Sequence, residues 1–323
     1  MLALFTSVLV GFSLVGCGKS KPTTTTVDGK KITTIRVVTQ TGFNETNIAD
    51  ELGYFKEEGI KIEYTGVLKS GITEFQLIAQ GINDAFIGSH PPNVAQARLA
   101  GIKVTMVAPG MVDNEKFPHV KYLVQKNSPI KSLKDINGQK VAISGVAACT
   151  DGYLKYYLIK EKLADKVNWV TLPNPGQMEQ ALAQGMIAVT TSHPPYAGLA
   201  EATGNVREIS TTWDIFHSPG AGLSCRGFTD EYIKDNPEVV KGFAKAMYKA
   251  RVWINTHQDQ AKDIIAKKLN LKAADLSVFW YDDNKGITPS YIDKWFEISE
   301  AIGLWKTGDI KPTDIYTNDY APK

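Results

Sequence analysis

Apolar and polar residues along this chain follow two recurring patterns, which are short β-like runs and longer helical periods. The first run covers residues 35–39, and a helical segment then ends near Tyr54 and Phe55. Strands that alternate with helices in this way predict βαβ units and a mostly parallel sheet. We therefore expect an α/β fold.

The same series of elements occurs twice, and the two copies share residues. The first strand closes at Thr41-Gly42 in one copy, and at Ser144-Gly145 after residues 140–143 in the other. A second strand follows in each copy (60–64 and 167–170), and then a helix that ends in Ala-Gln-Gly (79–81 and 183–185). The third strands end in the same four residues, Ser-His-Pro-Pro, at 89–92 and 192–195. Two matched series predict two similar α/β lobes.

The position of the repeats predicts how the chain divides. We expect a signal segment (1–17), a tether (18–32), the first part of lobe 1 (33–122), lobe 2 (123–224) and a return to lobe 1 with C-terminal helices (225–323). Segments 121–126 and 223–226 are predicted to cross between the lobes as hinges. Asn236-Pro237-Glu238 indicates a helix start, and the amphipathic stretch 239–255 predicts a helix that packs back on lobe 1.

The N-terminal segment differs from the rest of the chain. Residues 1–16 carry no charge and directly precede Cys17, in a run that is short for a membrane-spanning helix. Leu14-Val15-Gly16-Cys17 resembles a bacterial lipobox, in which the cysteine is acylated, for example with palmitate, and becomes the mature N-terminus. We expect a lipoprotein signal peptide, with a plain transmembrane anchor as the alternative. Either places the body outside the cytoplasm, and the threonine-rich stretch behind Cys17 is typical of a flexible tether.

Composition narrows the function classes. The chain has 323 residues, of which 43% are hydrophobic, enough for two cores. Its formal net charge is only +2, and no basic cluster is interleaved with aromatic residues, which argues against a nucleic-acid partner. Cys149 and Cys225 cannot form a disulfide framework, so we expect two semi-buried free thiols, with one bridge as the alternative.

Three stretches carry a family resemblance. They are LGYFKEEGI (52–60), SLKDINGQKVA (132–142) and NPEVVKGF (236–243). In this order behind a lipobox they resemble the sulfonate/nitrate/taurine and thiamine-precursor (pyrimidine) family of ABC-transporter solute-binding proteins, over nearly the whole mature chain. The resemblance implies a two-lobed, type II periplasmic-binding-protein fold that closes on a solute in the cleft between the lobes. It also implies delivery to a permease with its ATPase, and leaves the solute open.

The repeat predicts which loops form the ligand site. In an open parallel sheet, ligands bind outside the carboxyl ends of the strands, where loops lead into helices. Small residues there let a solute approach the backbone N–H groups, and hydroxyls add hydrogen bonds. Taken singly, each such residue could equally be an ordinary cap or turn. The candidates are Thr41, Gly42, Asn44, Ser70, Gly71, Ser89 and His90 from lobe 1, and Ser144, Gly145, Ala147, Asn174, Ser192 and His193 from lobe 2.

The two His-Pro pairs permit a sharper prediction. Proline favours the first helical position, so His90 and His193 are predicted to be N-caps. The positive end of a helix opposes protonation, and a neutral imidazole can donate to a carboxylate or sulfonate, stack on a ring, or ligate a metal. The alternative for each is a capping histidine at the lobe edge. Trp213 and Asp214 could form a cleft wall and an amine contact, or a packed loop with a solvated acid.

Motif content favours binding over catalysis. The G-x-x-x-x-G-K, G-x-S-x-G and H-E-x-x-H patterns are absent from the sequence, and we expect neither an enzyme nor a cofactor. The predicted function is that of a monomeric, extracytoplasmic solute-binding lipoprotein for a sulfonate, a taurine-like solute or a heteroaromatic thiamine precursor. One alternative is a transition-metal or metal-chelate binder using His90 and His193, with Asp214 or His217, and another is a sensor or adhesion lipoprotein. Arg98 lies too far into its helix to clamp an anion, which disfavours nitrate and favours a zwitterion or a neutral ring.

Overall fold

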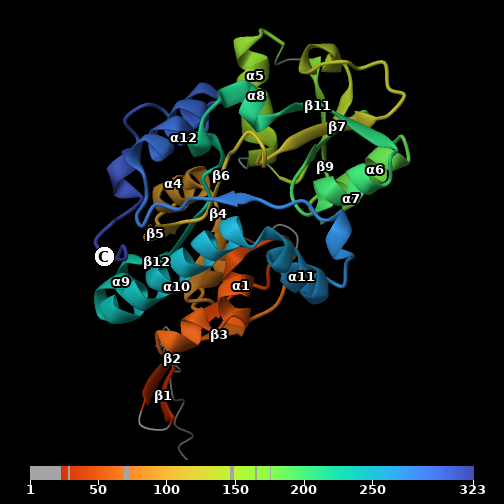
Figure 1. Ribbon diagram of the computed structural model, residues 1–323. Coiled ribbons are helices and arrows are strands. Elements are labelled where there is room, and N and C mark those ends of the chain that lie inside the picture. The colour runs from red at the N-terminus through yellow and green to blue at the C-terminus, as the bar shows by residue number, and fades with distance from the viewer. Residues whose placement is uncertain (1–22, 28–29, 69–72, 146–148, 164–165, 175) are drawn as a thin grey trace, which may run out of the picture.

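The strands of this protein gather into two lobes. The computed structural model describes residues 23–27, 30–68, 73–145, 149–163, 166–174 and 176–323. The upper, green lobe in Figure 1 comes from the middle of the chain, whereas the lower lobe combines the early strands with helices from the last third. The two lobes are called lobe 1 (the lower) and lobe 2 (the upper).

Lobe 2 is built on one five-stranded sheet in the order β11-β7-β10-β8-β9. Strand β8 pairs in parallel with β9 and β10, while β7 pairs antiparallel with β10 and β11. Four of the five strands therefore run in one direction, as the alternating pattern predicts. The bounds are β7 (Lys121–Gln125), β8 (Lys140–Ile143), β9 (Asn168–Thr171), β10 (Val189–Ser192) and β11 (Val206–Thr211).

Lobe 1 contains two three-stranded sheets, β1-β2-β3 and β4-β12-β5. Strands β2 and β3 are parallel, and β12 is antiparallel to both β4 and β5. The N–H of Asp84 donates to the carbonyl oxygen of Arg36 (2.9 Å), which links the two sheets. The bounds are β1 (Thr24–Val27), β2 (Lys30–Val37), β3 (Ile60–Tyr64), β4 (Ala85–Ser89), β5 (Val104–Pro109) and β12 (Cys225–Thr229).

The sequence repeat corresponds to a repeat in strand order. Lobe 1 reads β3-β2-β4-β12-β5 and lobe 2 reads β9-β8-β10-β7-β11, so matching strands occupy matching places. In lobe 1 the strand β12, which is antiparallel to both of its neighbours, comes from the later part of the chain, whereas in lobe 2 the matching strand, β7, directly precedes β8 in the sequence. Each lobe thus incorporates a strand that arrives through a crossing between the lobes.

The helices cover the sheets where the apolar periods predict them. Helix α10 begins at Pro237, as the Asn-Pro-Glu signal predicts, and its apolar side, which includes Phe243 and Met247, packs in one cluster with Ile35 of β2 and Phe55 of α2. Helix α10 therefore packs against β2 and α2 of lobe 1. The bounds are α1 (Glu45–Glu51), α2 (Tyr54–Glu57), α3 (Glu74–Ala79), α4 (Pro91–Leu99), α5 (Cys149–Lys160), α6 (Gln177–Ala183), α7 (Tyr196–Ala202), α8 (Thr212–Phe216), α9 (Asp230–Asp235), α10 (Pro237–Thr256), α11 (Gln258–Leu269) and α12 (Pro289–Ala301).

Short elements complete the fold. Strand β6 (Met111–Val112) pairs antiparallel with β13 (Trp280–Tyr281). The 3-10 helices are η1 (Leu133–Ile136), η3 (Pro219–Gly222), η4 (Ala273–Asp275) and η5 (Pro312–Asp314). In the part of the chain that the structure describes, none of the helices combines the length and apolar character needed to span a bilayer.

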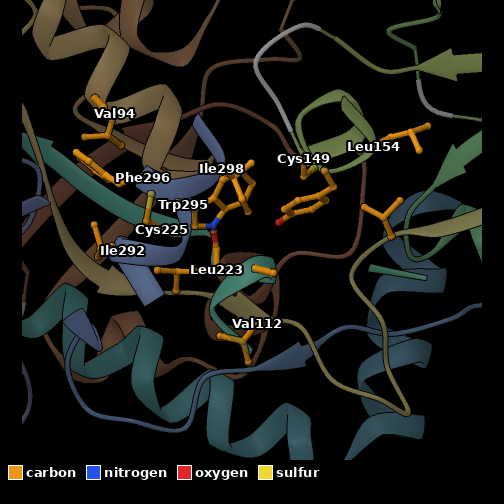
Figure 2. Packing of buried hydrophobic residues seen from close by; sticks show 14 of the residues in the cluster. Val94, Val112, Cys149, Leu154, Leu223, Cys225, Ile292, Trp295, Phe296 and Ile298 are labelled. Carbon is orange, nitrogen blue, oxygen red and sulfur yellow. The ribbon is translucent and has the colours of Figure 1, made fainter. Parts of the chain in front are cut away.

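One hydrophobic cluster extends across both lobes. Figure 2 shows Trp295 and Ile298 of α12 between Val94 of α4 and Cys149 of α5. The Trp295 side chain is 1% exposed. Burial of this ring therefore contributes on the order of 2–3 kcal/mol to the free energy of packing among α4, α5 and α12. Helix α12 is therefore an apolar bridge between the two lobes.

Candidate functional site

The repeated Ser-His turns stand at the ends of matching strands. Ser89 is the last residue of β4 and Ser192 is the last residue of β10. Strand β10 is parallel to β8, and β4 runs in the same direction as β5, because both are antiparallel to β12. Each turn therefore follows the carboxyl end of its strand, the place where open α/β sheets bind ligands. The structure thus places the two turns as the repeat predicts.

The two histidines differ in their relation to the next helix. His90 is the N-cap of α4, and Pro91 takes the first helical position, as predicted. The N-cap prediction for His193 is wrong, because Pro194 and Pro195 form a turn and α7 starts only at Tyr196, with Pro195 as its N-cap. His193 is therefore displaced from the helix end, and its imidazole is free to turn toward the other lobe.

A third histidine joins the first two. The ring of His119, in the connection between β6 and β7, lies 5.1 Å from the ring of His90 and 5.3 Å from the ring of His193, measured between centroids. His119 is 1% exposed. The Ser-His turns of the two lobes consequently lie on either side of His119, and we call this interlobe region the gap.

The Cys149 thiol completes this group. Its Sγ lies 2.9 Å from Nε2 of His193, and ligand atoms of His90, His119 and Cys149 all lie within 4.8 Å of one another. We call His90, His119, Cys149 and His193 the interlobe cluster. Cys149 and Cys225 are both free and buried, in agreement with the expectation of two thiols.

Hydrogen bonding fixes the tautomer of His90. Its Nδ1 lies 2.8 Å from the carbonyl oxygen of Leu223, and because a carbonyl only accepts, Nδ1 carries the proton. The same carbonyl accepts a bond of 3.1 Å from the indole N–H of Trp295, and Figure 2 shows Leu223 beside that ring. The lone pair of His90 is therefore on Nε2.

Burial keeps these imidazoles neutral. Desolvation lowers the pKa of His90 to about 4 and that of His193 to about 3, and it also lowers the pKa of His119 well below its usual value. The charge of Arg226 and the neighbouring imidazoles act in the same direction. Near neutral pH the cluster offers unprotonated nitrogen atoms.

The serines of the two turns are held by carboxylates of their own lobes, from the buried Glu74 and the half-buried Glu179. The Ser89 hydroxyl donates to Glu74 Oε2 (3.1 Å), and this oxygen also accepts the N–H groups of Ile87 and Gly88. In lobe 2 the Ser192 hydroxyl donates to Glu179. Burial raises the pKa of both carboxyl groups. This repeated Glu-Ser pair fixes the end of each strand, and sequence reasoning missed it.

The first loops of the repeat leave room beside their glycines. A Cβ built on Gly42 or Gly145 would meet no described heavy atom within 4 Å. Asn44, by contrast, is engaged as the N-cap of α1, where its Oδ1 accepts the N–H of Thr46. Ser144 bonds Thr150 through its hydroxyl. Open backbone therefore remains at the two glycine positions.

Other predicted loop residues lie elsewhere or cannot be placed. Asn174 is exposed, and its N–H donates to the side chain of Gln177. Ser70, Gly71, Ala147 and the lipidation candidate Cys17 lie outside the described residues.

Trp213, Asp214 and His217 form a separate region. Asp214 Oδ2 accepts the N–H of Thr211, in a capping box at the start of α8. The Trp213 ring packs edge-on to His217 at 6.2 Å. Trp213 also lines a surface hollow with Lys116, Phe117, Gln258 and Trp280. The structure groups His90 and His193 with His119 and Cys149 instead of with His217.

The lobes are in direct contact. The hydroxyl of Tyr196 in α7 donates to the carbonyl oxygen of Thr41 (2.8 Å), and the N–H of Gly198 donates to the hydroxyl of Ser277 (3.0 Å). Thr41 is one of the predicted site residues. The structure therefore represents an arrangement in which lobe 2 is seated on lobe 1.

Two arginines of lobe 1 are paired with carboxylates. Arg226 of β12 is fully buried and donates to Glu45 Oε2 at 2.6 Å. Arg98 binds Asp230 and the carbonyl oxygen of Val104, away from the turns. The guanidinium of Arg98 is thus engaged by Asp230 in this structure.

His119 and Cys149 are the cluster members that sequence reasoning missed. His119 lies two residues before β7 and therefore beside segment 121–126, which is predicted to cross between the lobes. This position near a crossing is the sequence feature that could have marked His119 as a site residue. Cys149 follows Ser144-Gly145 at the start of α5. Neither residue has a matching histidine or cysteine in the other copy of the repeat, so the repeat could not identify them as site residues.

Comparison with known proteins agrees with this architecture. Residues 40–261 match the family model described as "NMT1/THI5 like". A Bacillus subtilis (strain 168) protein named "Putative aliphatic sulfonates-binding protein" is 28% identical over 268 residues, which is 81% of this chain and 76% of that protein.

Two solved structures share the fold. The periplasmic aliphatic sulphonate binding protein SsuA from Escherichia coli superposes with a TM-score of 0.66 at 19% identity, covering 83% of this chain and 85% of that one. The periplasmic nitrate-binding protein NrtA from Synechocystis PCC 6803 gives a TM-score of 0.72 at 14% identity, covering 90% and 87%. The two-lobed periplasmic-binding-protein fold and the predicted family resemblance are both confirmed.

Proposed function

Because the chain belongs to the NMT1/THI5-like family, we propose that it is the extracytoplasmic solute-binding protein of an ABC importer and closes two lobes on a small polar organic solute. The observation that carries the proposal is that the Ser-His turns of both lobes meet at one gap through His119. The name of the Bacillus subtilis relative, an aliphatic sulfonates-binding protein, supports a sulfonate.

The charges around the gap favour a zwitterionic or uncharged solute. Arg226 is committed to Glu45, and the lobes hold Glu74 and Glu179 just behind the two turns. A small inorganic anion such as nitrate would need a free cation or a bidentate arginine. A taurine-like sulfonate carries its own ammonium group, and a heteroaromatic thiamine precursor carries no full charge. These two classes are the proposed solutes, in that order.

We also propose how the protein is attached to the membrane and which proteins it works with. Cys17 would carry the lipid after removal of residues 1–16, and the tether would hold the body at the outer face of the membrane, near a permease with its ATPase. Capture by lobe closure needs only one copy of the chain, so we propose a monomer.

We propose no catalytic role and no metal as the transported solute. Cys149 and His193 could in principle pair as nucleophile and base, but burial raises the pKa of the thiol, which disfavours the reactive thiolate. The relatives are named for sulfonates or as binding proteins. The His90, His193 and His217 metal alternative loses support because His217 packs against Trp213.

A thermal-shift screen with a chelator present tests the proposal. Taurine, ethanesulfonate, nitrate and an aminopyrimidine are added to the purified chain, followed by calorimetry for any compound that raises the melting temperature. A ligand at a hundredfold excess over its Kd stabilises the folded state by about 2.7 kcal/mol. We expect taurine or the pyrimidine to be active and nitrate to be inactive.

A double variant tests the location of the site. Replacing both His90 and His193 by alanine should weaken binding of the active compound, whereas His257→Ala, which removes an imidazole that stacks on Trp253, should not. If none of the compounds binds, the solute classes are wrong. If the double variant binds as the unmodified chain does, the gap is not the capture point.

A further inference from the structure

The interlobe cluster brings together four side chains that are metal ligands. Three imidazoles and one thiol come from separate segments: the start of α4, the β6–β7 connection, the start of α5 and the turn after β10. Ligand atoms of three of them lie within 4.8 Å of one another, and His193 Nε2 lies 2.9 Å from the same thiol. Nitrogen and sulfur donors at such spacing suit a tetrahedral ion, for which metal–ligand bonds are about 2.0–2.3 Å.

His119 is the strongest evidence that the cluster has a ligand. Its side chain is buried, yet neither Nδ1 nor Nε2 has a hydrogen-bond partner among the described residues. Leaving a buried polar group unpaired costs about 1–3 kcal/mol. Both neighbouring imidazoles, His90 and His193, present ring faces or edges at about 5 Å instead of hydrogen bonds. A bound ion would satisfy one of these nitrogens.

His90 is oriented as a metal-binding histidine is. Its Nδ1–H donates to the Leu223 carbonyl, which leaves the Nε2 lone pair available, and metal-ligating histidines almost always hold their second nitrogen in this way. The bond between the Trp295 indole and the same carbonyl holds that carbonyl in place.

We propose that His90, His119, Cys149 and His193 form a buried site for one zinc-class transition-metal ion that ties lobe 1 to lobe 2. The site shares His90 and His193 with the region proposed for solute capture, but the metal inference does not depend on that function, because the metal is titrated without any solute. His90 belongs to lobe 1, Cys149 and His193 belong to lobe 2, and His119 lies on the connection between them. An ion bound to all four side chains therefore joins segments that must separate when the lobes part.

The proton balance of binding is simple. The three imidazoles bind through nitrogens that carry no proton, while the Cys149 thiol loses its proton to solvent as the metal–sulfur bond forms. The thiolate leaves the site with one net positive charge when the ion is divalent. Binding to an ion offsets the cost that burial imposes on the bare thiolate.

Cobalt(II) provides a direct probe of this site. The full chain is stripped of metal with a chelator, dialysed and titrated with Co(II), and Zn(II) is then added in competition. We expect one Co(II) per chain, the visible absorption of a tetrahedral ion and a near-ultraviolet thiolate-to-cobalt charge-transfer band. Zn(II) should abolish both signals and raise the melting temperature.

Variants identify the ligands. Cys149→Ser should remove the charge-transfer band, and His119→Gln should weaken Co(II) binding by at least about tenfold. The matched controls are Cys225→Ser, at a buried thiol that donates to the Ser89 carbonyl, and His257→Ala. Both should keep the band and the affinity of the unmodified chain. Circular dichroism and urea midpoints establish that each variant is folded, and the titration of the unmodified chain does not depend on any variant.

Several outcomes would overturn the proposal. They are the absence of a tetrahedral Co(II) spectrum in the unmodified chain, a band that survives Cys149→Ser, and an affinity that His119→Gln leaves unchanged. Because taurine and pyrimidine binding are measured with chelator present, failure of the metal site and failure of the proposed solute function give different results.

Discussion

The hydroxyl of Tyr196 donates a 2.8 Å hydrogen bond to the backbone carbonyl oxygen of Thr41, and the two residues belong to different lobes. The bond is part-buried, and its acceptor is a loop at the carboxyl edge of lobe 1. It is a polar contact that favours the closed arrangement over the open one. Removing it should therefore change the equilibrium between these arrangements without unfolding either lobe.

Tyr196→Phe should shift the unliganded chain toward the open arrangement. A hydrogen bond of this kind contributes about 0.5–1.5 kcal/mol, which corresponds to roughly a twofold to tenfold change in the closed-to-open ratio. Small-angle X-ray scattering should report a larger radius of gyration. Tyr157→Phe, also in lobe 2, is the control. An unchanged scattering curve for Tyr196→Phe would mean that this bond does not hold the lobes together.

Glu45→Gln should destabilise lobe 1 strongly. Glu45 and Arg226 are both fully buried, so the variant leaves the guanidinium charge uncompensated, at a cost of about 3–5 kcal/mol. Urea denaturation measures the loss. Glu238→Gln, at an exposed pair with Lys241, should cost less than about 1 kcal/mol. Equal losses for the two variants would contradict the burial argument.

Two helical glycines should respond oppositely to alanine. A Cβ on Gly198 would lie 2.3 Å from the backbone nitrogen of Ser277 and 2.7 Å from the Asp275 carbonyl oxygen, so Gly198→Ala should cost about 1–3 kcal/mol by forcing α7 away from η4. A Cβ on Gly152 would make ordinary contact, 3.6 Å from Ile302 Cδ1, so Gly152→Ala should gain about 0.5–1 kcal/mol. Thermal unfolding of the two variants checks both signs.

Glu74 should make the stability of the protein depend on pH. Desolvation raises its folded-state pKa above the usual 4.5, so the folded state binds its proton more tightly than the unfolded state. This contribution is complete below the usual pKa and is lost as pH rises through the folded value. Glu74→Gln should therefore reduce the decline in unfolding free energy as the pH rises above the usual carboxyl pKa. Glu238→Gln is the exposed control, and an identical pH profile for Glu74→Gln would refute the assignment.

The fold could be predicted because local patterns and the repeat agree. The strands around Ile35 and Val141, the Pro237 helix start and the two Ser-His turns all lie where periodicity and turn chemistry place them. The amphipathic stretch after Pro237 also identified the helix that returns to lobe 1. Signals of this kind depend on residues close in sequence, and a single chain displays them.

The site was less predictable because its contacts connect residues that lie far apart in the chain. His119 and Cys149 reach the gap from segments outside the repeat, and only the packing of two lobes brings them to His90. The start of α7 was misjudged because a proline pair can form a turn as well as open a helix. Ser89 and Ser192 were expected to face a ligand, but glutamates more than ten residues earlier in the chain accept their hydrogen bonds.

The late position of β12 in the sequence makes the two lobes differ in the order in which their strands become available during synthesis. All five strands of lobe 2 come from one continuous stretch, from Lys121 to Thr211, so this lobe can assemble as soon as that stretch is available. Lobe 1 can be completed only after β12 has been synthesised, because β12 (Cys225–Thr229) is the strand that pairs with both β4 and β5. A chain that emerges from its N-terminus thus completes lobe 2, from the middle of the sequence, before lobe 1, and β4 and β5 gain their shared neighbour only after lobe 2 has been made.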